Sequence, residues 1–69
     1  MAITLKAARV NKGLSQRKAA KLLGISVDTL SNYERGKSFP DVPTIQQIER
    51  IYDCLYSDII FLPRFTDKP

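Results

Sequence analysis

The stretch around Gly24 constrains the fold of this chain more than any other feature of the sequence. Before it, Ser15 is a good helix N-cap and is followed by small and apolar side chains at helical spacing. After it, Ser26 is a second N-cap, and Leu30 lies on the apolar side of the residues that follow. Only residues 24–26 join the two helices, so the chain is expected to fold by packing short helices closely together.

The length and composition are those of one small folded domain. With 69 residues, the chain lies near the lower size at which a single apolar core holds a fold. Hydrophobic residues make up 43% and charged residues 26%, which is ordinary for soluble globular domains and unlike the polar bias of disordered chains. We therefore expect one soluble domain whose function lies on its surface.

Residue types that are rare or missing exclude several kinds of site. The single cysteine, Cys54, cannot form an internal disulfide, and the chain has no histidine. Metal centres and catalytic triads built on histidine are therefore excluded, and we expect neither a cofactor nor an enzyme. The longest apolar run, residues 59–63, is far shorter than the ~20 residues of a membrane span, and the first residues lack a signal-peptide layout. The expected location is the cytoplasm.

Helical spacing and turn residues predict an all-α, compact domain of five short helices. The first runs from about residue 4 to residue 11, because Gly13 then supplies a conformation that ends a helix. The second and third lie on either side of the three-residue turn. We expect the domain to span residues 1–63 and residues 64–69 to form a flexible C-terminal tail.

The last two helices are predicted after a proline-containing loop. The fourth has Asp41 or Thr44 as its cap and carries apolar residues at helical spacing. These residues are Ile45, Ile48, Ile51, Tyr52 and Leu55. The fifth begins at Ser57 or Tyr56 and is ended by Pro63.

Basic residues are concentrated in the first half of the chain. Residues 1–37 hold eight lysines and arginines against only Asp28 and Glu34, a net charge of +6. Residues 38–69 hold three basic and five acidic residues, a net charge of −2. This division is typical of a face that binds a polyanion, backed by a separate face for packing or dimerisation. Chance clustering on a solvated surface is the alternative.

The residues around the turn fit a helix-turn-helix, which places its second helix in the major groove of DNA. Ala20 leaves room where the two helices cross, and Gly24 reverses the chain without a Cβ penalty. Ile25 fills the corner between the helices, and Leu30 holds the second helix from beneath. So many agreeing choices favour a DNA-binding motif.

The same segment resembles the phage Cro and repressor family, the xenobiotic-response-element type of helix-turn-helix domain. The resemblance covers nearly the whole chain and is most specific in the Leu-Gly-Ile-Ser turn and the later Tyr-Glu-x-Gly-Lys run. It is carried by Leu14-Ser15-Gln16, Ala19-Ala20, Leu23-Gly24-Ile25-Ser26, the run from Leu30 to Lys37, Pro40, and the helix with Ile45, Ile48 and Ile51. It implies a five-helix repressor-type fold that binds operator DNA as a dimer or on paired half-sites.

The exposed side of the third helix holds the candidates for reading bases, which are Val27, Asp28, Ser31 and Asn32. Asn32 can bond adenine through two hydrogen bonds, Val27 can cover a thymine methyl group, and Ser31 can donate or accept. Asp28 has two interpretations. It accepts from an amino group of cytosine or adenine, or it only stabilises the helix N-terminus through the macrodipole.

A second set of residues is expected to contact the sugar-phosphate backbone, and four of them, Gln16, Arg35, Lys37 and Ser38, match positions at which the family does so. The set comprises Gln16, Arg17, Ser26, Thr29, Arg35, Lys37 and Ser38. Gln16 matches a family glutamine that holds a phosphate, and Lys6 adds positive charge. A plain polar role in the first helical turn is the alternative for Gln16, and a merely solvated role is the alternative for each basic residue.

The resemblance also implies an ion pair between Arg9 and Glu34, which would fix the first helix against the third. Breaking a buried pair costs about 3 kcal/mol, and breaking an exposed pair costs less. We expect this structural ion pair to affect DNA binding only indirectly.

Several large apolar residues are expected in the core or on a dimer face rather than in a ligand site. They are Phe39, Ile45, Tyr52, Phe61 and Phe65. Cys54 departs from the family pattern, which commonly has glycine or asparagine there. We expect Cys54 to cap the fourth helix or to pack near its end.

The sequence thus predicts a sequence-specific regulator of transcription that binds double-stranded DNA and acts as a repressor through major-groove contacts of the third helix. The alternative is an antirepressor or antitoxin-like module of the same shape that binds another protein. A homodimer, in solution or only on DNA, and a protein partner are both compatible with the sequence. Neither a membrane nor a small-molecule ligand is expected.

Overall fold

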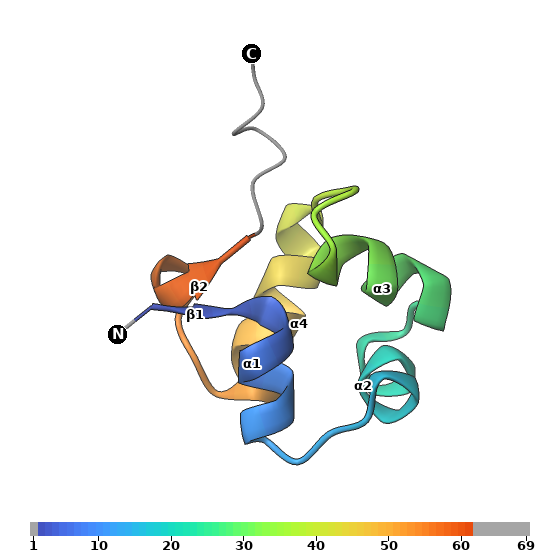
Figure 1. The fold of residues 1–69 in the computed structure, drawn as a ribbon, viewed down its shortest axis with the longest axis horizontal. Helices are drawn as coiled ribbons and strands as arrows, with labels where there is room; N and C mark the ends of the chain where they lie inside the picture. The colour runs from blue at the N-terminus through green and yellow to red at the C-terminus, as the bar shows by residue number, and fades with distance from the viewer. Residues whose placement is uncertain (1, 62–69) are drawn as a thin grey trace.

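Four α-helices pack around one small apolar core in the computed structural model, which describes residues 2–61 (Figure 1). The helices are α1 (Leu5–Asn11), α2 (Gln16–Leu23), α3 (Val27–Glu34) and α4 (Val42–Tyr52). The other elements are the strands β1 (Ile3–Thr4) and β2 (Ile59–Ile60), and the 3-10 turn η1 (Tyr56–Asp58) before β2. α2 and α3 lie together on one side of the molecule, and the strand pair lies on the other (Figure 1).

Each helix begins at a polar residue whose side chain accepts a hydrogen bond from a backbone N–H in the first turn. The caps are Thr4, Ser15, Ser26 and Asp41, and their donors lie 3.0–3.1 Å away. These bonds satisfy N–H groups that have no partner inside the helix. α2 ends at Gly24, whose φ of 73° is a left-handed conformation that glycine adopts without strain. The helix ends are therefore specified locally, as the sequence indicated.

The core receives side chains from all four helices and from β2. Its buried members are Leu5, Ala8, Ala19, Ala20, Leu23, Leu30, Ile48, Tyr52 and Ile59. Ala19 and Ala20 present only a methyl group, so α2 can pack closely against both α3 and α4. Leu30 is completely buried, and burying a leucine contributes about 1.5–3 kcal/mol. The core thereby fixes the position of α3 relative to α2.

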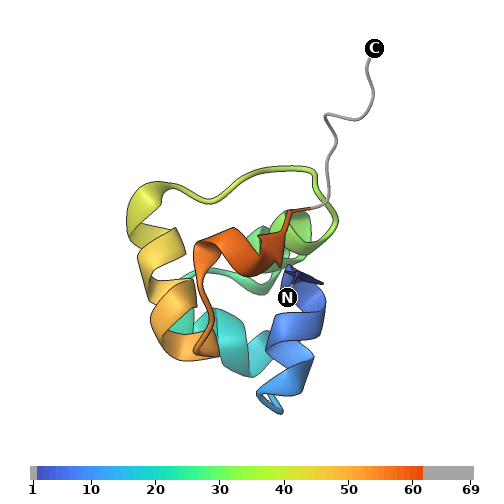
Figure 2. The same ribbon diagram turned by 90° about the vertical axis from the view of Figure 1, so that its left-hand side faces the viewer.

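The expectation of a fifth helix is wrong. η1 is a single 3-10 turn, and Ile59 and Ile60 are extended rather than helical. β2 pairs in parallel with β1, with Ile3 opposite Ile59 and Thr4 opposite Ile60, beside the start of α1 (Figure 2). Adjacent β-branched residues favour an extended backbone, and a helix of one or two turns would gain little from its own hydrogen bonds. The domain is therefore mainly helical, with a short parallel strand pair.

The structure shows which residues cap the two ends of α4. Of the two N-cap candidates, Asp41 is the cap, and its hydrogen bonds with Thr44 hold the pKa of the Asp41 carboxyl below its usual value. The C-cap is Asp53, which has a left-handed φ of 54°. Cys54 therefore does not cap the helix. It is half-buried against the core, and burial raises the pKa of its thiol.

The large apolar candidates divide between the core and the surface. Tyr52 is buried, Ile45 and Phe61 are half-buried, and Phe39 is 49% exposed. The rings of Phe39 and Phe61 lie 4.7 Å apart between centroids. Phe65, the end of the predicted fifth helix at Pro63 and the predicted tail at 64–69 lie outside the described residues.

Candidate nucleic-acid interface

α3 has one buried side and one accessible side. Leu30 and Glu34 are 0% and 7% exposed, and they face the rest of the domain. Asp28, Asn32 and Arg35 follow at helical spacing on the opposite side, where Asp28 and Arg35 are exposed and Asn32 is partly exposed. α3 is thus held from one side and presents a row of polar side chains on the other.

All four candidates for base reading lie on the accessible part of α3. Val27 is 38% exposed, and Ser31 is partly exposed like Asn32. Figure 1 shows α3 at the edge of the molecule, next to α2. The candidates can therefore reach a ligand without any rearrangement of the core.

Asn32 is already held by a neighbour on the same helix. The Arg35 Nη2 group donates to Asn32 Oδ1 over 3.3 Å. The amide oxygen of Asn32 is engaged by this bond, whereas its amide nitrogen carries two further donors. The amide oxygen keeps a second lone pair, so Asn32 can still present both a donor and an acceptor.

Ser26 and Thr29 are engaged with each other at the start of α3. The backbone N–H of Thr29 donates to Ser26 Oγ over 3.0 Å, and the Ser26 hydroxyl donates to Thr29 Oγ1 over 2.9 Å. The bond between the two hydroxyls uses one hydroxyl hydrogen, so the other hydroxyl hydrogen of the pair can point to an outside acceptor.

The other candidates for phosphate binding come from α2 and from the segment after α3. Arg17 is exposed at the start of α2, and Lys37 and Ser38 are exposed just after α3. The chain turns there at Gly36, which has a φ of 78°, and the Lys37 N–H donates to the carbonyl of Asn32 over 2.8 Å. Exposed basic and polar groups therefore lie at the start of α2 and directly after α3.

Gln16 differs from these exposed residues because its side chain makes an internal contact. It is partly buried, and its Nε2 donates to Glu34 Oε1 over 3.0 Å. The family resemblance implied a phosphate contact, and the plain alternative was a polar residue of the first turn. Neither view anticipated that Gln16 bonds to the glutamate beneath α3.

Arg9 and Glu34 meet in a buried site between α1 and α3. Arg9 Nε lies 2.6 Å from Glu34 Oε2, and Arg9 Nη2 lies 3.3 Å from Glu34 Oε1, which makes the contact bidentate. The two side chains are only 9% and 4% exposed. Arg9 Nη1 also donates to the carbonyl of Leu14 over 2.7 Å, just before the cap of α2. The pair therefore ties together α1, the entry to α2 and the end of α3.

Sequence reasoning missed two groups in this polar site. The Leu14 carbonyl was missed because a backbone carbonyl leaves no signal in a sequence. Tyr52 was expected only as an apolar core residue, but burial and then the charge of Glu34 raise its pKa to about 12. Its buried hydroxyl has no hydrogen-bond partner within residues 2–61. Tyr52 therefore stays protonated beside the ion pair.

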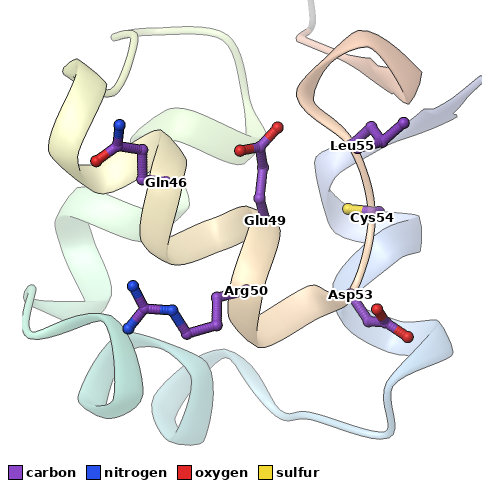
Figure 3. Close-up of a pocket in the computed structure, with 6 residues that line it drawn as sticks. All are labelled: Gln46, Glu49, Arg50, Asp53, Cys54 and Leu55. Atoms are coloured by element: carbon purple, nitrogen blue, oxygen red, sulfur yellow. The ribbon is translucent and has the colours of Figure 1, made fainter.

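A depression beside α4 offers no comparable arrangement. It is lined by Gln46, Glu49, Arg50, Asp53, Cys54 and Leu55, which come from α4 and the segment after it (Figure 3). Glu49 Oε2 accepts from the Tyr56 N–H over 2.7 Å, and Asp53 Oδ2 lies 3.9 Å from Lys12 Nζ. Both carboxylates thus already have partners. In the part of the chain that the structure describes, no cluster of three or more candidate metal ligands occurs.

The comparison with known protein families decides where the chain belongs. The family model described as Helix-turn-helix matches residues 5–59, which include all four helices. The chain is a member of the Cro/C1-type helix-turn-helix family. This is a family of DNA-binding transcription regulators. Between residues 2 and 61, the structure contains no helix that is long and apolar enough to cross a membrane.

Two relatives illustrate the similarity to this helix-turn-helix family. The HTH-type transcriptional regulator PuuR of Escherichia coli (strain K12) is 34% identical over 61 residues, which are 88% of this chain and 33% of PuuR. The HTH-type transcriptional regulator ImmR of Bacillus subtilis (strain 168) is 41% identical over 49 residues, which are 71% of this chain and 39% of ImmR. The chain thus spans well under half of the length of these relatives. No solved structure gives a significant match.

Proposed function

We propose that the chain binds double-stranded DNA sequence-specifically through α3 and regulates transcription, as a repressor at an operator. The observation that carries this proposal is the arrangement of α3 in a helix-turn-helix family member. Leu30 and Glu34 fix the helix from within, while Asp28 and Asn32 lie on its accessible side. A helix held in this way can enter the major groove, where the donor and acceptor pattern of each base pair is distinct.

The proposed base-reading residues are Val27, Asp28, Ser31 and Asn32. Asp28 offers only acceptors, and the major-groove edge of cytosine offers an amino donor, so Asp28 favours cytosine. Val27 covers a thymine methyl group. Asn32 reads adenine bidentately through its amide oxygen and amide nitrogen, and Arg35, which donates to that oxygen in the free chain, turns to a phosphate.

The proposed phosphate contacts surround this reading surface. They are made by Gln16, Arg17, Ser26, Thr29, Arg35, Lys37 and Ser38. The lysine and the two arginines supply affinity that depends on salt, and the uncharged residues fix the position of α3 on the duplex. Bound to an operator, the protein would repress by blocking access of the polymerase.

We further propose that two copies bind paired half-sites. The exposed aromatic and aliphatic residues of the C-terminal segment support this proposal. Tyr56 and Ile60 are 43% and 44% exposed, and the Tyr56 and Phe61 rings lie 5.6 Å apart between centroids. Burial of such side chains between two copies would favour a homodimer, in solution or only on DNA.

The same surface favours a second candidate function. Leu55 is 63% exposed next to Tyr56, and exposed apolar patches mark contact sites for proteins. The chain would then be an antirepressor or antitoxin-like module that uses the C-terminal segment to bind another protein.

An unbiased selection of the purified chain against random duplex DNA, at about 0.15 M salt, tests the proposed function. We expect an enriched motif, arranged as an inverted repeat with half-sites about one helical turn apart. Weak, salt-sensitive binding without enrichment would contradict sequence-specific recognition and favour the protein-interaction function.

A further inference from the structure

Glu34 accepts hydrogen bonds from two different residues, and only one of them is its ion-pair partner. Arg9 takes Oε2 at 2.6 Å and reaches Oε1 at 3.3 Å, and Gln16 Nε2 donates to Oε1 at 3.0 Å. The Glu34 side chain is only 4% exposed. The buried carboxylate is therefore the acceptor that sets the direction of the Gln16 amide.

Gln16 connects this buried site to the surface. It is the first residue of α2, it is partly exposed, and its amide nitrogen has two hydrogens. The bond to Glu34 uses one hydrogen, so the other can be donated to an oxygen outside the protein. A side chain that is oriented before binding loses less rotational freedom when the ligand arrives.

The surrounding groups keep Glu34 in place. Arg9 is held at its other end by the Leu14 carbonyl at 2.7 Å, so the guanidinium cannot swing away without losing that bond. Tyr52 packs in the same buried region with its hydroxyl protonated. The carboxylate is thus confined between a fixed arginine and the core, and Gln16 is the partner on its exposed side.

We propose that Glu34 is a positioning residue for DNA binding, which holds the Gln16 amide so that its second N–H donates to a backbone phosphate. This inference rests on the proposed function, and it gives a buried acidic residue an indirect part in binding an anion. The negative charge would act through Gln16 and would not touch DNA.

A double-mutant cycle separates this role from a purely structural one. Binding of the selected duplex is measured for the wild-type chain, Gln16→Ala, Glu34→Gln and the double variant, with the folded fraction checked by circular dichroism. In Glu34→Gln, the amide oxygen can satisfy Arg9 Nε, but its NH2 group then faces both donors to Oε1, which are Arg9 Nη2 and Gln16 Nε2, so the Gln16 amide must change its orientation. Tyr52→Phe is the control, because it changes the same buried region without touching Gln16.

We expect Glu34→Gln to weaken binding about threefold to tenfold when Gln16 is present and to have no further effect in Gln16→Ala. Tyr52→Phe should leave the affinity within about twofold. An equal loss from Glu34→Gln in both backgrounds would show that Glu34 acts only through the fold, and the inference would be wrong. If the wild-type chain selects no duplex, the proposed function itself fails.

A second measurement needs no variant and covers the case in which Glu34→Gln does not fold. The side-chain amide protons of Gln16 are followed by NMR and compared with those of Gln46 and Gln47, which are exposed. We expect one Gln16 proton to exchange slowly in the free chain and the other to shift on addition of duplex. Exchange of both protons as fast as in Gln46 and Gln47 would overturn the inference.

Discussion

The two sides of this domain differ in how their side chains are held. On the recognition side, which comprises α2, α3 and residues 35–38, the buried Glu34 carboxylate is paired with Arg9 of α1 at 2.6 Å and Leu30 is completely buried, although Leu22 and Val27 are 48% and 38% exposed. On the C-terminal side, residues 53–61, Leu55 and Ile60 are 63% and 44% exposed. The first side holds one helix in a defined position by a buried ion pair, whereas the second exposes large apolar side chains next to one another in the chain. This difference supports the proposal that the recognition side binds DNA and that the C-terminal side contacts protein.

The largest expected effect comes from breaking the buried ion pair. Arg9→Ala leaves the buried Glu34 carboxylate without its arginine, so we expect a loss of about 3–5 kcal/mol in the free energy of unfolding, measured by urea titration. Lys12→Ala is the matched control, because it breaks an exposed pair with Asp53 at 3.9 Å and should cost at most about 1 kcal/mol. Equal losses for the two variants would contradict the prediction that the buried pair contributes more to stability than the exposed pair.

The second effect concerns base preference. Asn32→Ala should weaken binding to the selected duplex by about 1–3 kcal/mol and relax preference at particular positions, because a bidentate base contact is lost. The matched control is Gln46→Ala, an exposed amide on α4. A selection repeated with Asn32→Ala that yields the wild-type motif at full affinity would show that the reading surface lies elsewhere.

The third effect is on salt dependence. Lys37→Ala should weaken binding to all sequences alike and reduce the slope of log K against log salt concentration by about one, because one phosphate contact is lost. Lys12→Ala removes the same charge from the end of α1 and should leave the slope nearly unchanged. The account fails for Lys37 if both variants change the slope equally.

The smallest effect concerns the buried hydroxyl beneath the recognition side. Tyr52→Phe should change the free energy of unfolding at pH 7 by less than about 1 kcal/mol, since the hydroxyl has no hydrogen-bond partner within residues 2–61. Burial raises the pKa of Tyr52 to about 12, above its ordinary value of 10, so ionisation favours the unfolded chain. The stability that this shift contributes is present below pH 10 and is lost as the pH rises from 10 towards 12.

The pH dependence can be measured by urea unfolding in steps from pH 9 to pH 12. Tyr52→Phe should lose less stability than the wild-type chain over this interval. The exposed Tyr56 gives a matched control, since Tyr56→Phe should follow the wild-type curve. A curve for Tyr52→Phe that coincides with the wild-type curve would contradict the raised pKa.

The difference between local and long-range contacts explains how much of the fold could be predicted from the sequence. The ends of α2 and the start of α3 were predictable because Ser15, Gly24 and Ser26 act on their immediate neighbours. The fifth helix was predicted wrongly because the extended form of Ile59 depends on pairing with Ile3, at the other end of the described chain. Local patterns carry no information about such a partner.

The candidate site, too, could be predicted only in part from the sequence. The candidate residues for DNA contact are predicted from helical spacing and resemblance, and the structure brings Arg9 and Glu34 together at 2.6 Å. The bond from Gln16 to Glu34 and the position of Tyr52 depend on how α1, α2 and α4 meet in space. No short stretch of the sequence determines how these helices pack against one another.

The most direct test of DNA binding through the recognition side is an NMR titration of the isotope-labelled chain with the selected duplex. We predict that backbone amide shifts concentrate in residues 16–18 and 26–38, with the largest around Asn32. Residues 46–55, around the depression beside α4, should change little. Shifts concentrated in residues 46–61, with α3 unaffected, would contradict the account.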